Sequence, residues 1–515
     1  MWKSHSPIDM VVVVVVDIVI QRPSTLSPTT DLWRFDLTGP PDPSLRTHPL
    51  RHSLRPPMSL LRAPIFGGAL PASTPGPHKD IGYAYIRSNV LAPHTVPWPH
   101  NKLTGQPALN IEEVGYAVFY PCSKVQGGSN GVTWFPDPAD EMVRGYDRFL
   151  GKKGFSWLFR GLKYIVGRLK FPAHLNAALL PSSTKHPLII FSHGLAGTRT
   201  TYTQYCSALA SQGYVVLAVE HRDGSAPAVL LPPSAPLPSP SPSLASGSGT
   251  TTPKKHQPKD RVLGYIKKDE IEWEEGQEKS LEAFRTLQLE MRVREVYEAF
   301  YSFKRISNGD VGKVTFDKMD AAAQPRWVDS VRDKVDLDLI DLTGHSFGAG
   351  TILHLLHTPV PDPQYSPLPV KRAIALDPWV EPIPTPTASD PPQNAPESLP
   401  PVLVINSPGF TVWKGHFQRL VKMTKKIDGT LLSIPGITHQ SFSDFPLLAP
   451  SSPTPALAFV KIINELSDSF LSGRLASSEY IRDQRADGGE FEKGSDGKMA
   501  GKVGEVVLHL LGKQE

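Results

Sequence analysis

The stretch Gly344-His345-Ser346-Phe347-Gly348 decides the fold, because it joins a strand-like run to a helix-like one. Leu337–Thr343 (LDLIDLT) precedes it, and Thr351–Leu356 after it has the composition of a buried helix. The pattern G-x-S-x-G between a strand and a helix predicts a tight, strained turn that projects the serine hydroxyl from a sheet edge. Glycines on either side let strand and helix pack closely. The motif therefore predicts Ser346 as a nucleophile, with a glycine-rich turn that carries no chemistry as the alternative.

Short apolar runs bounded by turn residues recur along the chain and are typical of buried parallel strands. They are 115–120 (GYAVFY), 188–191 (LIIF), 214–219 (YVVLAV), 373–376 (AIAL), 402–405 (VLVI) and 430–434 (TLLSI). Between them, Ala283–Lys304 carries one apolar stripe at helical spacing. Alternating strands and helices predict an α/β architecture. With the serine turn, they predict an α/β-hydrolase fold, a mostly parallel central sheet flanked by helices, with low-complexity loop insertions.

Proline clusters set the expected domain limits. The 515 residues include 53 prolines, roughly twice the usual share of about 5%. We expect a mostly disordered N-terminal extension over 1–75 and a catalytic domain over 76–475. Low-complexity insertions are expected at 226–260 and 381–400 within that domain. A polar C-terminal tail is expected over 476–515.

Charge, cysteine content and the start of the chain bear on partners, disulfides and location. The net charge of +4 does not indicate a nucleic-acid partner. Two cysteines cannot build a disulfide framework. Met10–Val16 and Ile18–Ile20 form an apolar run shorter than the about 20 residues that span a bilayer. A signal peptide and a start without a targeting role both remain open, with a cytoplasmic or membrane-peripheral location favoured over secretion. The sequence does not indicate an oligomeric state.

A serine nucleophile needs a base, and the base needs an orienting acid. In this fold the acid and then the histidine follow the serine along the chain. Asp377 directly follows the strand-like run AIAL, whereas the rival Asp390 lies in low-complexity sequence. His439 follows the last strand-like run and is the expected base, with His416 as its main rival.

The reaction also needs two N–H donors for the oxyanion. The residue after the nucleophile supplies one, and a loop after an early strand supplies the other. These rules predict the backbone N–H groups of Phe347 and of Leu195, the latter in the loop Phe191–Gly197 (FSHGLAG). A structural glycine turn is the alternative for that loop.

Several motifs together resemble the platelet-activating-factor acetylhydrolases, a lipase-like branch of the α/β-hydrolases. The matching pieces are FSHGL at 191–195, VEHRD at 219–223, GHSFG at 344–348, LDPW at 376–379 and HQSFSDF at 439–445. They occur in the family's order, and the strand end Tyr120-Pro121-Cys122 is also similar. Ala349 stands where the family has a second glycine, and the first 75 residues have no counterpart.

The resemblance implies a Ser346–Asp377–His439 triad, oxyanion donors at Leu195 and Phe347, and a buried polar network at Glu220–Asp223. It implies calcium-independent hydrolysis of short or oxidised sn-2 acyl esters of glycerophospholipids such as platelet-activating factor, with no metal or cofactor. A general carboxylesterase or triacylglycerol lipase on the same fold is the alternative. A non-catalytic lipid-binding protein is a third interpretation.

Residues 152–171 (KKGFSWLFRGLKYIVGRLKF) predict an amphipathic helix with a basic face. Six basic and no acidic residues occur there, with apolar residues on the opposite face. This composition is typical of helices that lie in the headgroup region of a membrane. We therefore expect peripheral membrane contact, with Trp157, Arg160 and Lys163 as candidate residues. A surface helix that packs on the core is the alternative.

Overall fold

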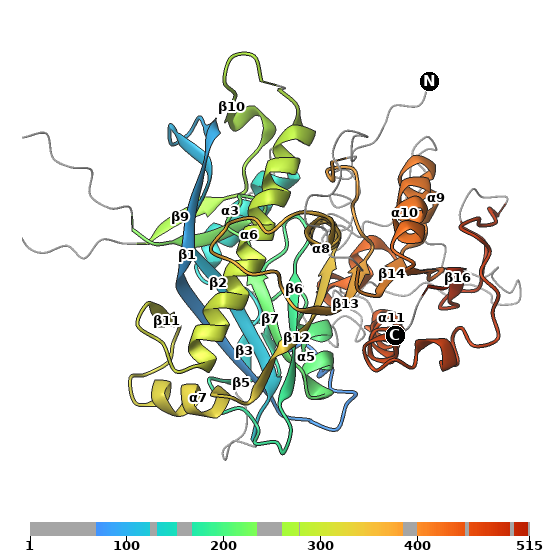
Figure 1. Ribbon diagram of the computed structural model, residues 1–515, viewed down its shortest axis with the longest axis horizontal. Helices are drawn as coiled ribbons and strands as arrows, with labels where there is room; N and C mark the ends of the chain where they lie inside the picture. The colour runs from blue at the N-terminus through green and yellow to red at the C-terminus, as the bar shows by residue number, and fades with distance from the viewer. Residues whose placement is uncertain are drawn as a thin grey trace, which may run out of the picture.

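A computed structural model describes residues 68–123, 131–151, 167–233, 260–277, 279–384, 399–448, 453–494 and 499–512. One twisted sheet runs through the molecule. In spatial order its strands are β10 (Ile271–Glu272), β1 (Ile81–Asn101), β2 (Gln106–Pro121), β7 (Val215–Glu220), β6 (His186–Ser192), β12 (Val335–His345), β13 (Val370–Leu376), β14 (Val402–Asn406), β15 (Thr430–Ser433) and β16 (Val507–Leu510). Figure 1 shows β1 and β16 on opposite sides of the sheet.

In this order, β7, β6, β12, β13, β14 and β15 pair in parallel. The pairs β1 with β2, β2 with β7 and β15 with β16 are antiparallel. Each expected strand-like run forms one of these strands. Helices are described in the connections from β6 to β7, β7 to β12, β12 to β13 and β14 to β15, as is usual between parallel strands. The chain therefore has the predicted α/β-hydrolase fold, a mostly parallel sheet with flanking helices.

Helices cover both faces of the sheet because its strands bury both faces. Along β6, Leu188 and Ile190 join one core, and Ile189 and Phe191 join the other, as the alternation of side chains in a strand requires. The first core contains residues of α6 (Leu281–Ser307), α7 (Ala323–Val331), α8 (Phe347–His357) and α10 (Lys414–Lys426). The second contains residues of α3 (Ala139–Leu150), α5 (Thr203–Ser211) and α11 (Thr454–Leu471). Helix α6 crosses in front of the strands in Figure 1.

Smaller elements complete the described chain. They are α9 (Pro408–Val412), the short strands β3 (Val132–Thr133), β4 (Lys170–Phe171), β5 (His174–Leu175), β8 (Ala228–Leu231), β9 (Arg261–Gly264) and β11 (Val314–Phe316), and the 3-10 turns η2 (Lys268–Glu270), η3 (His439–Phe442), η4 (Phe445–Leu448) and η5 (Leu475–Ser477). No helix among the described residues is long and apolar enough to cross a membrane.

The edges of the expected insertions and extensions are folded. Residues 228–231, placed in the first insertion, form β8 and pair with β9. Ala228 and Val229 are buried there, so local packing overrides the polar composition that follows them. Ile383, at the start of the second insertion, is also buried. At the N-terminal side, Leu70 is buried and its N–H donates to the carbonyl of Lys170.

Two other expectations differ from the structure. The expected polar tail contributes β16, whose apolar residues extend the sheet beyond β15. The last residues of the predicted amphipathic helix, Lys170 and Phe171, instead form β4, where Phe171 packs into the second core. Residues 152–166, which include Trp157, Arg160 and Lys163, lie outside the described residues.

Candidate active site

The turn at Ser346 has the geometry that its motif predicts. Ser346 has φ 58° and ψ −118° between β12 and α8, a backbone conformation that non-glycine residues rarely adopt. A Cβ on Gly348 would lie 2.0 Å from the carbonyl oxygen of Ser192, and one on Gly344 would lie 2.6 Å from Gly348 backbone atoms. A side chain at either position would collide with neighbouring backbone atoms. Both positions therefore require glycine.

The three expected triad residues converge at the carboxyl end of the sheet. His439 Nε2 lies 2.8 Å from Ser346 Oγ, and His439 Nδ1 lies 2.7 Å from Asp377 Oδ2. Ser346 follows β12, Asp377 follows the adjacent strand β13, and His439 begins η3 after β15. Asp377 is fully buried, whereas His439 remains partly exposed. The arrangement has the serine–base–acid order that activates a hydroxyl nucleophile.

The Asp377 carboxylate is held by neighbours from β14 and the residue after it. Ser407 donates its backbone N–H to Oδ1 over 2.7 Å and its hydroxyl to Oδ2 over 2.6 Å. The Asn406 amide nitrogen, turned toward the carboxylate, donates to Oδ1 over 3.0 Å. The opposite orientation would set two acceptors face to face. These donors and His439 together fix the carboxylate plane.

The rival residues lie elsewhere. His416 Nε2 is 2.9 Å from the carbonyl oxygen of Pro378, not beside the serine, and burial lowers the pKa of His416 to about 4. Asp390 lies outside the described residues. Among the described residues, His345, Asp377 and His439 form the group whose possible metal-ligand atoms all lie within 4.8 Å of one another. Hydrogen bonds within the site engage the Asp377 oxygens and both His439 ring nitrogens.

Aromatic neighbours fix the plane of the His439 ring. Phe410 of α9 stacks on it with a centroid distance of 4.5 Å and an interplanar angle of 2°. His345 lies on the ring as well, at 4.5 Å, and its Nδ1 contacts the Tyr202 hydroxyl over 2.9 Å. Burial, and then the neighbouring His439, lower the pKa of His345 well below its ordinary value. His345 therefore stays neutral and does not repel an imidazolium on His439.

The loop that carries Leu195 lies directly against the nucleophile. A Cβ on Gly194 would lie 3.0 Å from Ser346 Cβ and 3.2 Å from the Tyr202 hydroxyl oxygen. Ala196 has φ 54°, and its N–H donates to the carbonyl of Ser225 over 2.8 Å. Phe347 is the first residue of α8, where N–H groups point out of the helix. The structure thus places Phe347 and the loop that contains Leu195 next to the serine.

Arg292 of α6 anchors this loop from behind. Its guanidinium is fully buried and donates to the His193 carbonyl over 2.6 Å and to Asp223 Oδ2 over 2.8 Å. The same group lies 4.5 Å from the ring centroid of Phe347. One side chain therefore contacts the loop of Leu195 and the residue that carries the other expected donor.

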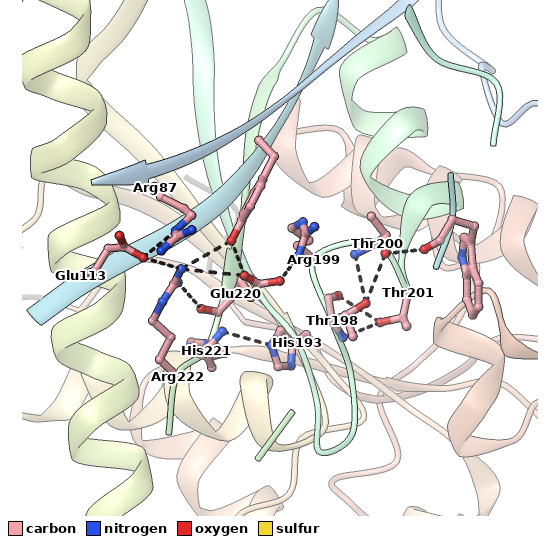
Figure 2. A network of polar contacts seen from close by, with 12 residues as sticks. Arg87, Glu113, His193, Thr198, Arg199, Thr200, Thr201, Glu220, His221 and Arg222 are labelled. Carbon is pink, nitrogen blue, oxygen red and sulfur yellow. Dashed lines mark hydrogen bonds and ion pairs between the residues drawn. The ribbon is translucent and has the colours of Figure 1, made fainter. Parts of the chain in front are cut away.

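The residues of the network predicted at Glu220–Asp223 are all buried. Figure 2 shows Glu220, His221 and Arg222 beside His193 of the same loop. His221 donates its backbone N–H to His193 Nε2 over 3.2 Å, and its Nδ1 lies 2.5 Å from a Glu295 carboxylate oxygen. Burial lowers the pKa of His221 and raises the pKa of Glu295 to about 8, so both favour their neutral forms. Arg199, which follows the loop in the chain, forms an ion pair with Glu220 at the end of β7.

Asp444 fixes the segment that carries His439. Its fully buried carboxylate accepts from the N–H groups of Thr203 and Gln204, over 2.8 and 3.0 Å, at the start of α5. Trp134 Nε1 also donates to it over 2.8 Å. A carboxylate suits the positive end of a helix. The contact with the start of α5 gives the aspartate of the HQSFSDF motif, Asp444, a structural role.

Sequence reasoning did not identify Asn406, Ser407, Phe410, Arg292 or Asp444 as parts of the site. The position of Ser407 directly after a strand neighbouring that of Asp377 was a signal that could have found it. Asp444 lies in the HQSFSDF motif, which marks its position but not its partners. The contacts of Asn406, Phe410 and Arg292 join residues far apart in the chain, and the sequence pattern carries no sign of them.

Comparisons with known proteins agree on one family. The family model for platelet-activating factor acetylhydrolase, isoform II, matches residues 101–462. Platelet-activating factor acetylhydrolases of Gallus gallus and Cavia porcellus are 30% and 31% identical over 61% and 60% of this chain. Those alignments cover 64% and 61% of the two relatives, less than two thirds of their length. A putative phospholipase A2 of Schizosaccharomyces pombe is 45% identical over 14% of this chain and 17% of its own.

Among solved structures, a ferulic acid esterase from Streptomyces cinnamoneus aligns with a TM-score of 0.46 and 15% identity, over 83% of this chain and 96% of that one. The family model accounts for well over half of the chain, including the turn at Ser346 and the segments of Asp377 and His439. The chain belongs to the platelet-activating factor acetylhydrolase, isoform II, family.

Proposed function

We propose that this protein is a calcium-independent serine hydrolase that removes short or oxidised sn-2 acyl groups, such as acetyl, from glycerophospholipids. The observation that carries the proposal is the contact of His439 with Ser346 Oγ at 2.8 Å and with Asp377 at 2.7 Å. Family membership supports the choice of a phospholipid ester as substrate.

The proposed mechanism is a two-step acyl transfer. His439 removes the proton of Ser346, which attacks the sn-2 carbonyl, while Asp377 orients the imidazole and stabilises its charge. The oxyanion accepts from the N–H groups of Leu195 and Phe347. His439 then protonates the departing lysophospholipid oxygen. Water activated by His439 releases the acyl group from Ser346.

Labelling with a fluorophosphonate tests the assignment of the nucleophile. We expect stoichiometric labelling of the wild type and none of Ser346→Ala, with the same loss for hydrolysis of 2-acetyl phosphatidylcholine. His416→Gln is a control at a buried histidine outside the proposed triad. Labelling that survives in Ser346→Ala contradicts the proposal and favours the non-catalytic alternative at this site.

A substrate series separates the proposal from a general carboxylesterase or triacylglycerol lipase. We expect kcat/KM to fall steeply as the sn-2 chain of phosphatidylcholine lengthens, and oxidatively truncated chains to be cleaved. A preference for long-chain triacylglycerol contradicts the phospholipid assignment.

Peripheral membrane contact through residues 152–171 belongs to the same proposal. The basic and apolar faces that the sequence places on this segment suit a phospholipid surface. We expect Arg160→Glu/Lys163→Glu to weaken binding to anionic vesicles, while hydrolysis of a soluble short-chain ester stays unchanged. Unaltered vesicle binding contradicts membrane contact at this segment.

A further inference from the structure

The segment after the family match folds onto the edge of the sheet next to the site. The family model ends at residue 462. Beyond it, β16 pairs with β15 through Leu432 with Leu508 and Ser433 with Val507. Gln484 braces the new strand, because its amide donates to the Val506 carbonyl over 2.6 Å and accepts from the Leu508 N–H over 3.1 Å.

His509 of β16 directs its side chain toward Ser433 of β15. It is fully buried, and Phe417 of α10 packs edge-on against its ring at 5.1 Å. Its Nδ1 faces two acceptors, Asp487 Oδ2 at 2.8 Å and the Glu490 carbonyl at 3.0 Å. Nδ1 therefore carries a hydrogen. The other ring nitrogen, Nε2, lies 2.8 Å from Ser433 Oγ.

A continuous line of buried polar groups leads from Ser433 to the triad. Ser433 Oγ lies 2.8 Å from Thr411 Oγ1, and Thr411 Oγ1 lies 3.1 Å from the Asn406 amide oxygen. The Asn406 nitrogen donates to Asp377 Oδ1 over 3.0 Å. Ser433, Thr411 and Asn406 are all fully buried. Water therefore cannot replace a lost partner without a cavity forming.

We propose that His509 is a positioning residue for the triad, acting on Asp377 through Ser433, Thr411 and Asn406. The inference rests on the proposed function, since it assigns a role to a residue that supports the triad aspartate. His509 fixes the Ser433 hydroxyl, and this in turn fixes the hydroxyl of Thr411 and the orientation of the Asn406 amide. Without His509 the Ser433 hydroxyl loses a partner, and the Thr411 hydroxyl can turn wholly to the Ser407 carbonyl, which lies 2.9 Å away. The Asn406 oxygen then keeps only the Thr411 N–H at 3.3 Å, so the amide holds the Asp377 carboxylate less firmly.

A double-mutant cycle on kcat tests the connection. For 2-acetyl phosphatidylcholine we expect His509→Ala to lower kcat about fivefold with KM unchanged, and to have no further effect in an Asn406→Ala background. The effects of substitutions at independent sites add, so a merely structural role of His509 would lower kcat by the same factor in both backgrounds. Non-additive effects on kcat therefore indicate that His509 acts through Asn406. Equal losses of kcat in the two backgrounds, or no loss in either, overturn the proposal.

Two variants control for stability. His186→Ala removes a buried histidine at the far end of β6, with hydrogen bonds to the carbonyls of Gly213 and Leu180, and should leave kcat unchanged. His509→Gln places an amide near Nε2 and should restore most of kcat. Failure of His509→Gln to restore kcat, in a protein with wild-type melting temperature, counts against the proposal. Loss of labelling in Ser346→Ala tests the proposed function separately, so the two can fail independently.

Discussion

Arg292 donates a 2.6 Å hydrogen bond to the carbonyl of His193, two residues before the proposed oxyanion donor Leu195. The same guanidinium packs on the ring of Phe347, which carries the other proposed donor. Helix α6, which contributes no reacting group, therefore contacts both parts of the proposed oxyanion hole. This relationship leads to a prediction about rate rather than affinity.

We expect Arg292→Lys to lower kcat about tenfold or more and to change KM little, since losing one oxyanion donor costs roughly a hundred- to a thousandfold. Lysine keeps the charge beside Asp223 but lacks the planar group that bridges loop and ring. Steady-state kinetics on a soluble ester measure the effect. Arg285→Lys, on the same helix with bonds to Gln288 and Tyr265, is the matched control. Equal loss of kcat in both variants contradicts the positioning role.

Asp444→Asn should destabilise the protein and slow the reaction together. The neutral amide interacts less favourably with the start of α5 and loses one of two acceptor atoms. We expect a loss of about 1–3 kcal/mol in unfolding free energy and a severalfold fall in kcat. Urea denaturation measures the first and ester hydrolysis the second. The exposed Asp483→Asn should change neither, and equal stability of the two variants contradicts the account.

Gly348→Ala should be poorly tolerated, because the added Cβ would sit 2.0 Å from the carbonyl oxygen of Ser192. Strand and helix must separate to make room, and we expect a loss of about 1–3 kcal/mol or more. Gly415→Ala, with nothing within 4 Å, is the matched control and should not destabilise α10. Thermal unfolding of the two variants checks the difference. Similar melting temperatures would contradict the close approach of the Gly348 and Ser192 backbones.

Asp341 predicts a pH dependence of stability. The residue is buried within β12, and burial raises the pKa of Asp341 to about 7. The unfolded value is about 3.9, so the folded state binds the proton more tightly between about pH 4 and pH 7. Its contribution therefore makes stability fall as pH rises through that window.

We expect Asp341→Asn to raise the unfolding free energy at pH 8, by up to about 4 kcal/mol, and to change it little at pH 4. Asp338→Asn, exposed on the same strand, should be neutral at both pH values. Denaturation at the two pH values provides the measurement. A variant that is no more stable than the wild type at pH 8 argues against a raised pKa of the buried Asp341 carboxyl.

The strands and the triad candidates could be predicted because their signals are local. Short apolar runs mark buried strands, and residue order along the chain places Asp377 and His439 after Ser346. The contacts of Asn406, Arg292 and His509 could not be predicted, because each joins segments brought together only by sheet order and helix packing. The apolar runs at β8 and at the end of the tail, where β16 lies, are too short to predict strands by themselves. Each forms a strand because a partner strand lies beside it.

The central claim is that Ser346, activated by His439 and Asp377, cleaves sn-2 esters. Mass spectrometry of the protein treated with 2-acetyl phosphatidylcholine and rapidly acid-quenched tests it most directly, because the proposed mechanism passes through an acyl-enzyme. We expect an acetyl group on Ser346 in the wild type, longer-lived in His439→Ala treated with an activated acetyl ester. An acetyl group on another residue, or turnover that persists in Ser346→Ala, would contradict the account.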